Sequence, residues 1–328
     1  MKAAERNIEN EFVSNGRSFE QEALALFRIQ AKECGVYRKF LEIRRIKPDM
    51  ICHIEEIPFL PVGFFKDFRV QCGESDPEVV FTSSGTTGMQ QSKHYVQSAG
   101  IYERSFLGAY RMFYGEPSSW RILALLPSYL QRKGSSLIYM TEKLIDLSGH
   151  KESGFYRYDY DRLAVTLGKL EREGKRTLLL GVSHALLEFA EKFPVKLQHT
   201  IIMETGGMKG HGKELTREEL HGILKKAFET DEIHSEYGMT ELLSQAYSAG
   251  NGIFRTPPWM KIMVRDMYDP FSYVSFGKTG GINVIDLANR HSCAFVETAD
   301  LGRLHPGGYF EVLGRFDQSE LRGCNLPL

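Results

Sequence analysis

The chain lacks the features that mark nucleic-acid-binding and membrane proteins. Its 41 Lys and Arg residues are balanced by 42 Asp and Glu residues, which leaves a net charge of −1. It therefore has no basic excess of the kind that binding to a phosphate backbone requires. It also has no run of about 18 apolar residues, and residues 1–7 contain no apolar core of a signal peptide. We therefore expect a cytoplasmic protein that binds neither nucleic acid nor membrane.

Cysteine is scarce as well, with five residues among 328. Their odd number, their wide spacing and the lack of a C-x-x-C pair argue against a disulfide framework and against a zinc site. Four of them are expected to pack as small hydrophobic residues, namely Cys34, Cys52, Cys72 and Cys293. Cys324 differs, because it lies four residues from the end of the chain in a polar, glycine-containing segment where burial is hard to arrange.

The composition is that of a globular protein with one large or two moderate domains. Hydrophobic residues make up 42% and charged residues 25% of the chain. Helical and strand-like patterns alternate without an internal repeat, which favours an α/β or an α+β fold. Apolar residues at helical spacing predict a helix or a helix pair over 20–43 that is interrupted near Gly35, and prolines predict an extended segment over 57–63.

Apolar runs predict four strands in the middle of the chain, at 122–126, 177–180, 200–203 and 232–234. A capping box formed by Thr216 and Glu219 predicts a helix before the fourth strand. Beyond Gly250 the strand-like pieces are short and separated by Gly, Pro and Asn, as in a small sheet or barrel. These pieces are 260–264, 281–286, 293–298 and 309–313.

The most informative segment is a loop of serines, threonines and two glycines that follows the apolar stretch 79–81. Its residues are Thr82, Ser83, Ser84, Gly85, Thr86, Thr87 and Gly88. Glycines let backbone N–H groups approach an anion, and hydroxyls add donors that suit phosphate oxygens. The lysine of a Walker loop is missing, and Lys93 lies too far on, so an ordinary P-loop is not indicated. From these residues alone, a phosphate cradle and a polar turn between a strand and a helix remain equally open.

Three further segments combine polar side chains with expected strand ends or turns. Segment 235–241 places a tyrosine, a threonine and a carboxylate after a strand and before a helical run, where ligands gather in α/β folds. Segment 297–302 places Asp300 beside a turn, where it could accept hydrogen bonds from a sugar diol. The third segment is 314–323. Each of them alone also fits a capping or solvated side chain.

In this order the four segments resemble those of the adenylate-forming superfamily, which includes acyl-CoA synthetases, luciferases and the adenylation domains of peptide synthetases. The resemblance implies that loop 82–88 holds the β- and γ-phosphates of ATP, that Thr240 contacts the α-phosphate and that Glu241 binds Mg²⁺. It further implies adenine contacts from Tyr237, Gly238, Gly206 and Gly207, and ribose contacts from Asp300 and Arg315.

The resemblance also implies an α/β fold, that of the large N-terminal domain of this superfamily. That domain has two sheets packed with helices and a small distorted β-barrel, and the mobile C-terminal domain is lacking here. We accordingly expect four parts. These are a helical N-terminal region at 1–80, an α/β core with the ATP site at 81–250, a small β-subdomain at 251–313, and a hinge remnant with a cysteine-bearing tail at 314–328.

The end of the chain narrows the resemblance. A small domain with a catalytic lysine normally follows the hinge, whereas this chain stops eleven residues after Asp317. A chain of this kind with a cysteine near its end is similar to the LuxE-type acyl-protein synthetases. That similarity implies ATP-dependent activation of a carboxylic acid, expected to be a fatty acid, as acyl-AMP. The acyl group would then pass to Cys324, as the catalytic nucleophile, and on to an acyl reductase partner.

Several alternatives stay open on the sequence. The missing lysine could be replaced by Lys93, by Mg²⁺ alone or by a partner protein. The chain could instead be an acyl-CoA or carrier-protein ligase that uses a separate C-terminal domain, or a non-catalytic nucleotide-binding protein. His184, which follows a Ser183 cap at an expected helix start, could line the substrate pocket or be structural. The aromatic run within 102–114 could line an acyl tunnel, although its helical spacing also fits plain core.

Overall fold

The computed structural model describes residues 12–14, 16–83, 90–127, 134–206 and 215–315. The N-terminal region begins with two helices, α2 (Phe19–Glu33) and α3 (Gly35–Ile43), as the helical pattern predicted. Ser18 caps α2 by accepting from the Gln21 N–H in a capping box, and Cys34, which is extended, separates the two helices. The proline-rich segment gives the short strand β1 (Leu60–Pro61), between the turns η1 (Pro48–Met50) and η2 (Ile54–Glu56) and the helix α4 (Phe64–Asp67).

The middle of the chain alternates strands and helices. The strands are β4 (Arg121–Leu125), β5 (Gly154–Phe155), β6 (Thr177–Gly181), β7 (Thr200–Glu204) and β8 (His234–Tyr237), and neighbours among them are parallel. The helices are α5 (Ala99–Tyr114), α6 (Ser136–Ser148), α7 (Tyr160–Arg172), α8 (Ser183–Lys192) and α9 (Arg217–Phe228), with η3 (Pro117–Ser119) before β4. The capping box of Thr216 and Glu219 at the start of α9 is confirmed.

The expected strand at 232–234 is wrong in its bounds, because β8 runs from His234 to Tyr237. Its middle residues are Ser235 and Glu236, which an apolar pattern does not identify as strand. Both are buried all the same, since β8 lies inside the sheet between β7 and a neighbour on its other side. Burial of this polar strand therefore comes from its partners and not from its own composition.

Helices cover both faces of the parallel strands. On β6, Leu178 and Leu180 belong to the core shared with α5 and α6, whereas Leu179 belongs to the core shared with α7, α8 and α9. Successive side chains of a strand point to opposite faces, so the apolar run of β6 serves both layers. This pattern is typical of a parallel sheet that is buried on both sides.

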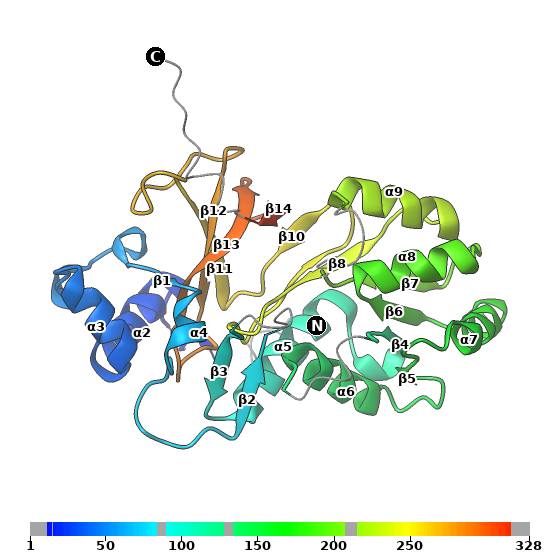
Figure 1. The fold of residues 1–328 in the computed structure, drawn as a ribbon, viewed down its shortest axis with the longest axis horizontal. Coiled ribbons are helices and arrows are strands. Elements are labelled where there is room, and N and C mark those ends of the chain that lie inside the picture. The colour runs from blue at the N-terminus through cyan, green and yellow to red at the C-terminus, as the bar shows by residue number, and fades with distance from the viewer. Residues whose placement is uncertain (1–11, 15, 84–89, 128–133, 207–214, 316–328) are drawn as a thin grey trace, which may run out of the picture.

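The later strands are antiparallel and continue the same sheet. They are β9 (Ala246–Ser248), β10 (Ile253–Arg255), β11 (Met260–Arg265), β12 (Thr279–Asp286), β13 (Phe295–Leu304) and β14 (Phe310–Arg315). The hydrogen-bonded order is β11-β12-β13-β14-β10-β9-β8-β7-β6-β4-β5, with β1 on β13. In this order β8, β9 and β10 join the parallel part to the antiparallel part, and Figure 1 shows α2 and α3 beside the antiparallel part. The α/β fold class is confirmed, and the expected sheets are joined edge to edge.

A separate two-stranded hairpin, β2 (Val79–Thr82) and β3 (Lys93–Val96), lies below the junction of the two parts in Figure 1. Three of the four cysteines expected to be buried are indeed buried, namely Cys34, Cys72 and Cys293. The expectation for Cys52 is wrong, because Cys52 is exposed just before η2, where its N–H donates to the Glu56 carboxylate. Among the described helices, none combines the length and the apolarity that crossing a bilayer would take.

Candidate functional site

The described start of the hydroxyl-rich loop lies at the end of the β2–β3 hairpin. β2 ends at Thr82 and β3 returns antiparallel to it, so a turn between a strand and a helix is the wrong description. The Ser83 N–H donates to the Ser92 carbonyl at 3.0 Å, and the Ser92 N–H donates to Ser83 Oγ at 2.9 Å. These two bonds close the base of the loop. The other predicted phosphate-binding residues lie outside the described residues, namely Ser84, Gly85, Thr86, Thr87 and Gly88.

A glycine from a different part of the chain fixes the other side of this base. The Thr82 N–H donates to the Gly134 carbonyl at 2.7 Å. Gly134 has φ +85°, and a Cβ there would lie 2.9 Å from the Val80 carbonyl oxygen. Only glycine meets both conditions without strain. The loop therefore starts from a backbone position that is tied to two other segments.

The chain turns directly after β8 instead of entering the expected helical run. Residues 238–245 lead back into β9, which pairs antiparallel with β8. Thr240 and Glu241 lie in this turn, and the Asp286 carboxylate accepts hydrogen bonds from the Leu243 and Ser244 N–H groups at 2.7 and 3.0 Å. The position of the two predicted site residues therefore depends on a carboxylate at the end of β12.

The Glu241 carboxylate faces the base of the loop. Glu241 is 6% exposed. Burial raises the pKa of Glu241, and a hydrogen bond from the Ser92 side chain opposes this shift. Ser92 is the residue that closes the loop base with Ser83. The structure thus brings the predicted magnesium ligand together with the described part of the predicted phosphate loop.

His94 and Asn289 hold the backbone of the Thr240–Glu241 turn. His94 Nδ1 lies 2.8 Å from the Thr240 carbonyl, and Asn289 Nδ2 donates to the Glu241 carbonyl at 2.9 Å. Because a carbonyl oxygen only accepts, His94 Nδ1 carries the proton in this bond. Burial lowers the pKa of His94 to about 4, so the ring is neutral at pH 7. His94 lies on β3 and Asn289 follows β12, so side chains from two distant segments position the turn.

A second group of predicted residues meets between β8, β13 and β14. The Tyr237 hydroxyl donates to Asp300 Oδ2 at 2.9 Å, and Arg315 Nε lies 3.6 Å from Asp300 Oδ1. Asp300 and Arg315 are also register partners on β13 and β14. The expectation that Asp300 lies beside a turn is wrong, because β13 continues through it to Leu304. The predicted ribose and adenine residues are nevertheless in direct contact.

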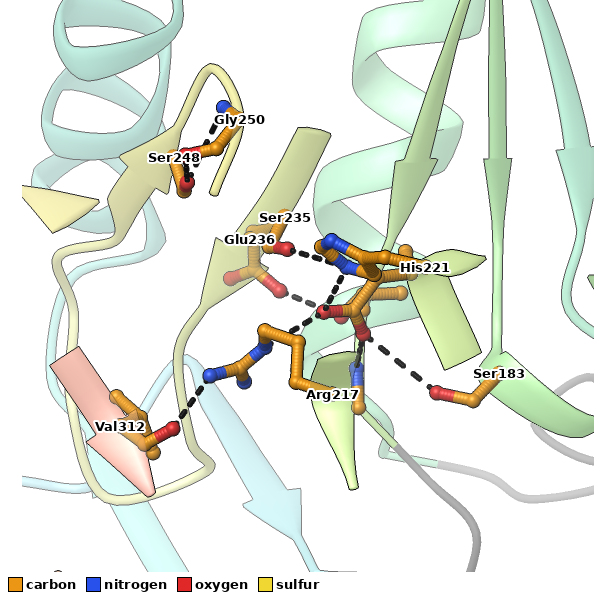
Figure 2. Close-up of polar contacts among 11 residues, drawn as sticks. Ser183, Arg217, His221, Ser235, Glu236, Ser248, Gly250 and Val312 are labelled. Atoms are coloured by element: carbon orange, nitrogen blue, oxygen red, sulfur yellow. Dashed lines mark hydrogen bonds and ion pairs between the residues drawn. The ribbon is translucent and has the colours of Figure 1, made fainter. Parts of the chain in front are cut away.

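A buried ionic cluster lies at the end of β7 (Figure 2). Arg217 Nε lies 3.2 Å and His221 Nε2 lies 3.6 Å from Glu204 Oε1, and the Gly206 N–H donates to Glu204 Oε2 at 3.1 Å. Burial alone would raise the pKa of Glu204, but the hydrogen bond from His221 and the charge of Arg217 lower it to about 2. Arg217 also donates to the Val312 carbonyl of β14. The cluster therefore connects the turn at Gly206 with the last described strand, while Gly207 lies outside the described residues.

Glu236 lies next to this cluster but has a different environment. The Thr205 hydroxyl donates to its carboxylate. Burial and the charge of Glu204 raise the pKa of Glu236 to about 7, although the Thr205 bond acts the other way. No ion pair of Glu236 occurs within the described ranges. It is a buried carboxylate without a counter-charge from that part of the protein.

This pKa predicts a pH-dependent stability. The folded pKa of about 7 lies above the ordinary value of 4.5, so the folded protein holds the proton more tightly than the unfolded chain. Stability from this group is complete below pH 4.5 and is lost as the pH rises through 7. One pKa unit corresponds to about 1.4 kcal/mol, so we expect a loss of about 3 kcal/mol that Glu236→Gln lacks. Urea unfolding of both proteins at several pH values measures it, and parallel curves would refute this pKa.

His184 and Ser183 lie at the first turn of α8. The expected Ser183 cap is wrong, because the N-cap is Val182 and makes no side-chain capping bond, and Ser183 is the first helical residue. Its hydroxyl donates instead to Glu204 Oε2 at 3.5 Å. His184 is 9% exposed, and its place in a substrate pocket stays a prediction.

Several residues of this site carry no signal in the sequence. They are Ser92, His94, Glu204, Arg217, His221, Asp286 and Asn289. His94 and Asn289 act on a turn that is 146 and 48 positions away in the chain, so no local spacing could identify them. Cys324, the predicted acyl acceptor, lies outside the described residues.

Comparison with known proteins agrees with the expected resemblance. No protein-family model matches the chain. A segment of 68 residues is 37% identical to the long-chain-fatty-acid–luciferin-component ligase of Photorhabdus luminescens, which corresponds to 20% of this chain and 58% of that relative. The expected similarity to LuxE-type and adenylate-forming enzymes is confirmed as a similarity over part of the chain.

Solved structures of ligases share the fold. The ATP-bound MatB from Rhodopseudomonas palustris aligns with a TM-score of 0.54 at 16% identity, over 74% of this chain and 49% of that chain. A 2-hydroxyisobutyryl-CoA ligase in complex with 2-HIB-AMP and CoA aligns with a TM-score of 0.66 at 13% identity, over 91% of this chain and 68% of that chain. The chain thus spans about half of MatB. At identities this low, the structural likeness shows that the chain shares the fold of adenylate-forming ligases. The chemistry of the site residues has to indicate the activity.

Proposed function

We propose that this chain, which has the fold of the adenylate-forming ligases, catalyses the ATP-dependent activation of a carboxylic acid as acyl-AMP. The observation that carries the proposal is the contact between Glu241 and the base of the 82–88 loop through Ser92 and Ser83. A buried carboxylate beside a loop rich in hydroxyls and glycines suits a metal-bound polyphosphate. The ATP-bound MatB structure of the same fold adds support.

The residues present fit a magnesium ion. The Glu241 carboxylate is buried, and burial raises its pKa, so a cation beside it would offset an unfavourable charge. The described residues contain no group of three or more metal-ligating side chains. This agrees with Mg²⁺, which binds through one or two carboxylates and completes its shell with phosphate oxygens and water. When bound, the ion supplies positive charge to the phosphate oxygens.

The remaining roles are proposed from the resemblance, and the contacts among these side chains support them. Thr240 would donate to the α-phosphate, while Thr82 and Ser83 begin the loop around the β- and γ-phosphates. Asp300 would accept hydrogen bonds from the ribose hydroxyls, with Arg315 beside it. Tyr237 and Gly238 would flank the adenine together with the turn at Gly206. These assignments place the nucleotide between β8, β13 and the hairpin.

The proposed first step is an in-line displacement on the α-phosphorus. A carboxylate oxygen of the acid forms a bond to phosphorus while the bond to the pyrophosphate oxygen breaks, so that pyrophosphate leaves with the bonding electrons. Because a carboxylate is a poor acceptor of nucleophiles, this step replaces an oxide leaving group by AMP. His94 and Asn289 hold the backbone of Thr240 and Glu241. The Thr240 hydroxyl would therefore already face the charge that develops on the α-phosphate.

The proposed second step transfers the acyl group to Cys324. The thiolate adds to the carbonyl carbon, AMP leaves, and a thioester forms that an acyl reductase partner would consume. The name of the P. luminescens relative, a ligase for a long-chain fatty acid, supports a fatty acid as substrate. Coenzyme A is the second candidate acceptor, favoured by the CoA complex of the 2-hydroxyisobutyryl-CoA ligase with the same fold.

The first step is tested by pyrophosphate release with a panel of carboxylic acids and with Glu241→Gln. We expect wild-type turnover with at least one acid. We also expect roughly a 100-fold lower rate in the variant, because a Mg²⁺ ligand acts on charge worth several kcal/mol in the transition state. Glu152→Gln is the matched control, since Glu152 is a partly buried carboxylate paired with Lys169 of α7. Full activity of Glu241→Gln, or no release with any acid, would overturn the proposal.

A further inference from the structure

A second polar cluster lies between α5 and the strands β8 and β9, on the face of β8 opposite to Tyr237. We call it the tyrosine cluster, and it consists of Tyr102, Tyr110, Tyr114, Glu236, Gln245 and Tyr247. Three of its polar atoms are buried and make no hydrogen bond to any residue that the structure describes. These atoms are the hydroxyls of Tyr110 and Tyr247 and the side-chain oxygen of Gln245.

Five members of the cluster are neighbours of one another, and Tyr102 is linked to Glu236 by its electrostatic effect. Glu236 and Tyr247 are register partners on β8 and β9, so their side chains share one face of the sheet. A Cβ on Gly238 would lie 2.5 Å from Glu236 Oε1 and 3.3 Å from Gln245 Cγ, which places these two side chains side by side. The ring of Tyr114 lies 5.3 Å from the rings of both Tyr110 and Tyr247.

The unpaired atoms of the cluster are one acceptor, the Gln245 oxygen, and two hydroxyls that can each donate and accept, those of Tyr110 and Tyr247. Glu236 receives one hydrogen bond, from Thr205, and its pKa is raised by burial and by the nearby negative charge of Glu204. Gln245 is 3% exposed and its oxygen can only accept. Burial raises the pKa of Tyr102, Tyr114 and Tyr247, and the negative charge of Glu236 adds to this in each case. A buried arrangement of this kind is stabilised by a group that donates hydrogen bonds.

We propose that the tyrosine cluster binds a hydrogen-bond-donating substituent, an ammonium or a hydroxyl group, on the carbon chain of the acid that the enzyme activates. An ammonium would donate to Glu236, to the Gln245 oxygen and to the Tyr247 oxygen, whereas a hydroxyl would donate to Glu236 or Gln245 and accept from the Tyr247 hydroxyl. This inference rests on the proposed function and narrows its substrate class. A plain alkyl chain would leave the three buried atoms without partners, and an additional carboxylate would oppose the charge of Glu236.

The geometry agrees with a substituent on the activated acid. Glu236 and Tyr237 are consecutive on β8 and therefore point to opposite faces, with Tyr237 on the side of Asp300 and Glu236 on the side of α5. The same strand leads into the turn with Thr240 and Glu241. One end of an acid could thus reach the reaction centre while its chain extends along the α5 face. Figure 2 shows Glu236 on β8 beside the Glu204 cluster.

The test compares matched acids with the full-length protein. Straight-chain acids of several lengths are offered plain, and with a hydroxyl or an amino group at C3 or at the far end. We expect kcat/KM for pyrophosphate release to be at least about tenfold higher for one substituted acid than for its plain counterpart. In Tyr247→Phe and Glu236→Gln this preference should fall to about twofold or less. A preference for an amino group should fall more in Glu236→Gln than a preference for a hydroxyl group.

Tyr156→Phe is the matched control, because its buried hydroxyl donates to the Glu152 carbonyl in the core on the other side of the sheet. It should keep the wild-type preference. Melting temperatures establish that each variant is folded. If Glu236→Gln does not fold, Tyr247→Phe still tests the inference. A preference for plain acids that neither variant changes would overturn the inference.

A second measurement separates the inference from the proposed function. The melting temperature is recorded with each acid alone, without ATP. If no acid is adenylated, the proposed function fails, and the inference is then judged by this binding assay. It holds if a substituted acid raises the melting temperature of the wild type and of Tyr156→Phe but not of Tyr247→Phe, and it fails if no substituted acid does so.

Discussion

Cys324→Ser is expected to release pyrophosphate at the wild-type rate and to carry no acyl group. The hydroxyl of serine is a far weaker nucleophile than a thiolate at neutral pH, so acyl-AMP should form but the thioester should not. Intact-mass measurement after incubation with ATP, Mg²⁺ and an accepted acid gives the result directly. The wild type should gain the mass of one molecule of the acid less one water, and hydroxylamine should remove the acyl group.

The described cysteines provide the controls. Cys52 is exposed, so Cys52→Ser should be acylated as fully as the wild type. Cys34, Cys72 and Cys293 are buried, and burial raises the pKa of Cys293 well above its ordinary value, which keeps its thiol unreactive. Acylation of Cys324→Ser to the wild-type extent would show that the acceptor lies elsewhere. Transfer to added coenzyme A by both proteins would favour the ligase alternative.

Asp286→Ala is expected to lower the free energy of unfolding by about 3–5 kcal/mol. The Asp286 carboxylate accepts from the Leu243 N–H at 2.7 Å, from the N–H and hydroxyl of Ser244 at 3.0 and 2.6 Å, and from the Ala288 N–H at 3.1 Å. Removing the acceptor leaves three backbone N–H donors without a partner in a fully buried place, and each such donor costs about 1–3 kcal/mol. The Ser244 hydroxyl keeps the Ser105 hydroxyl as a partner. Urea unfolding monitored by circular dichroism measures the loss.

Asp286→Asn and Asp269→Ala serve as controls for this prediction. Asn keeps one acceptor oxygen, so its loss should be smaller than that of Ala. Asp269 also accepts from a backbone N–H and a serine hydroxyl, those of Phe271 and Ser272, but it is exposed. Water replaces those bonds, so Asp269→Ala should unfold like the wild type. Equal stability of Asp286→Ala and wild type would mean that water satisfies the Leu243–Ser244 turn.

Several parts of the fold followed from local patterns in the sequence. The apolar periodicity of 20–43 gave α2 and α3, and the Thr216–Glu219 box gave the start of α9. Apolar runs located β4, β6 and β7 within a residue or two. These features depend on neighbours within a few positions, where capping and burial of one face act.

Other parts could not be predicted in this way. β8 was misplaced because His234, Ser235 and Glu236 are polar, and the burial of Ser235 and Glu236 results from the place of β8 inside the sheet. Asp300 was expected beside a turn, yet both Asp300 and Gly302 lie within β13. A Cβ at Gly302 would approach the Glu311 carbonyl oxygen within 2.6 Å, so this glycine permits close packing of strands and not a turn.

The sequence by itself determined the fold class, the resemblance to adenylate-forming enzymes and the hydroxyl-rich loop 82–88, because each depends on residue types at short spacing. Only the tertiary structure decided that Ser92 links that loop to Glu241, that His94 and Asn289 hold the turn, and that Glu236 faces the tyrosines of α5. These contacts join residues whose sequence separation carries no periodic signal. They exist because sheet register and helix packing bring distant segments to the same place.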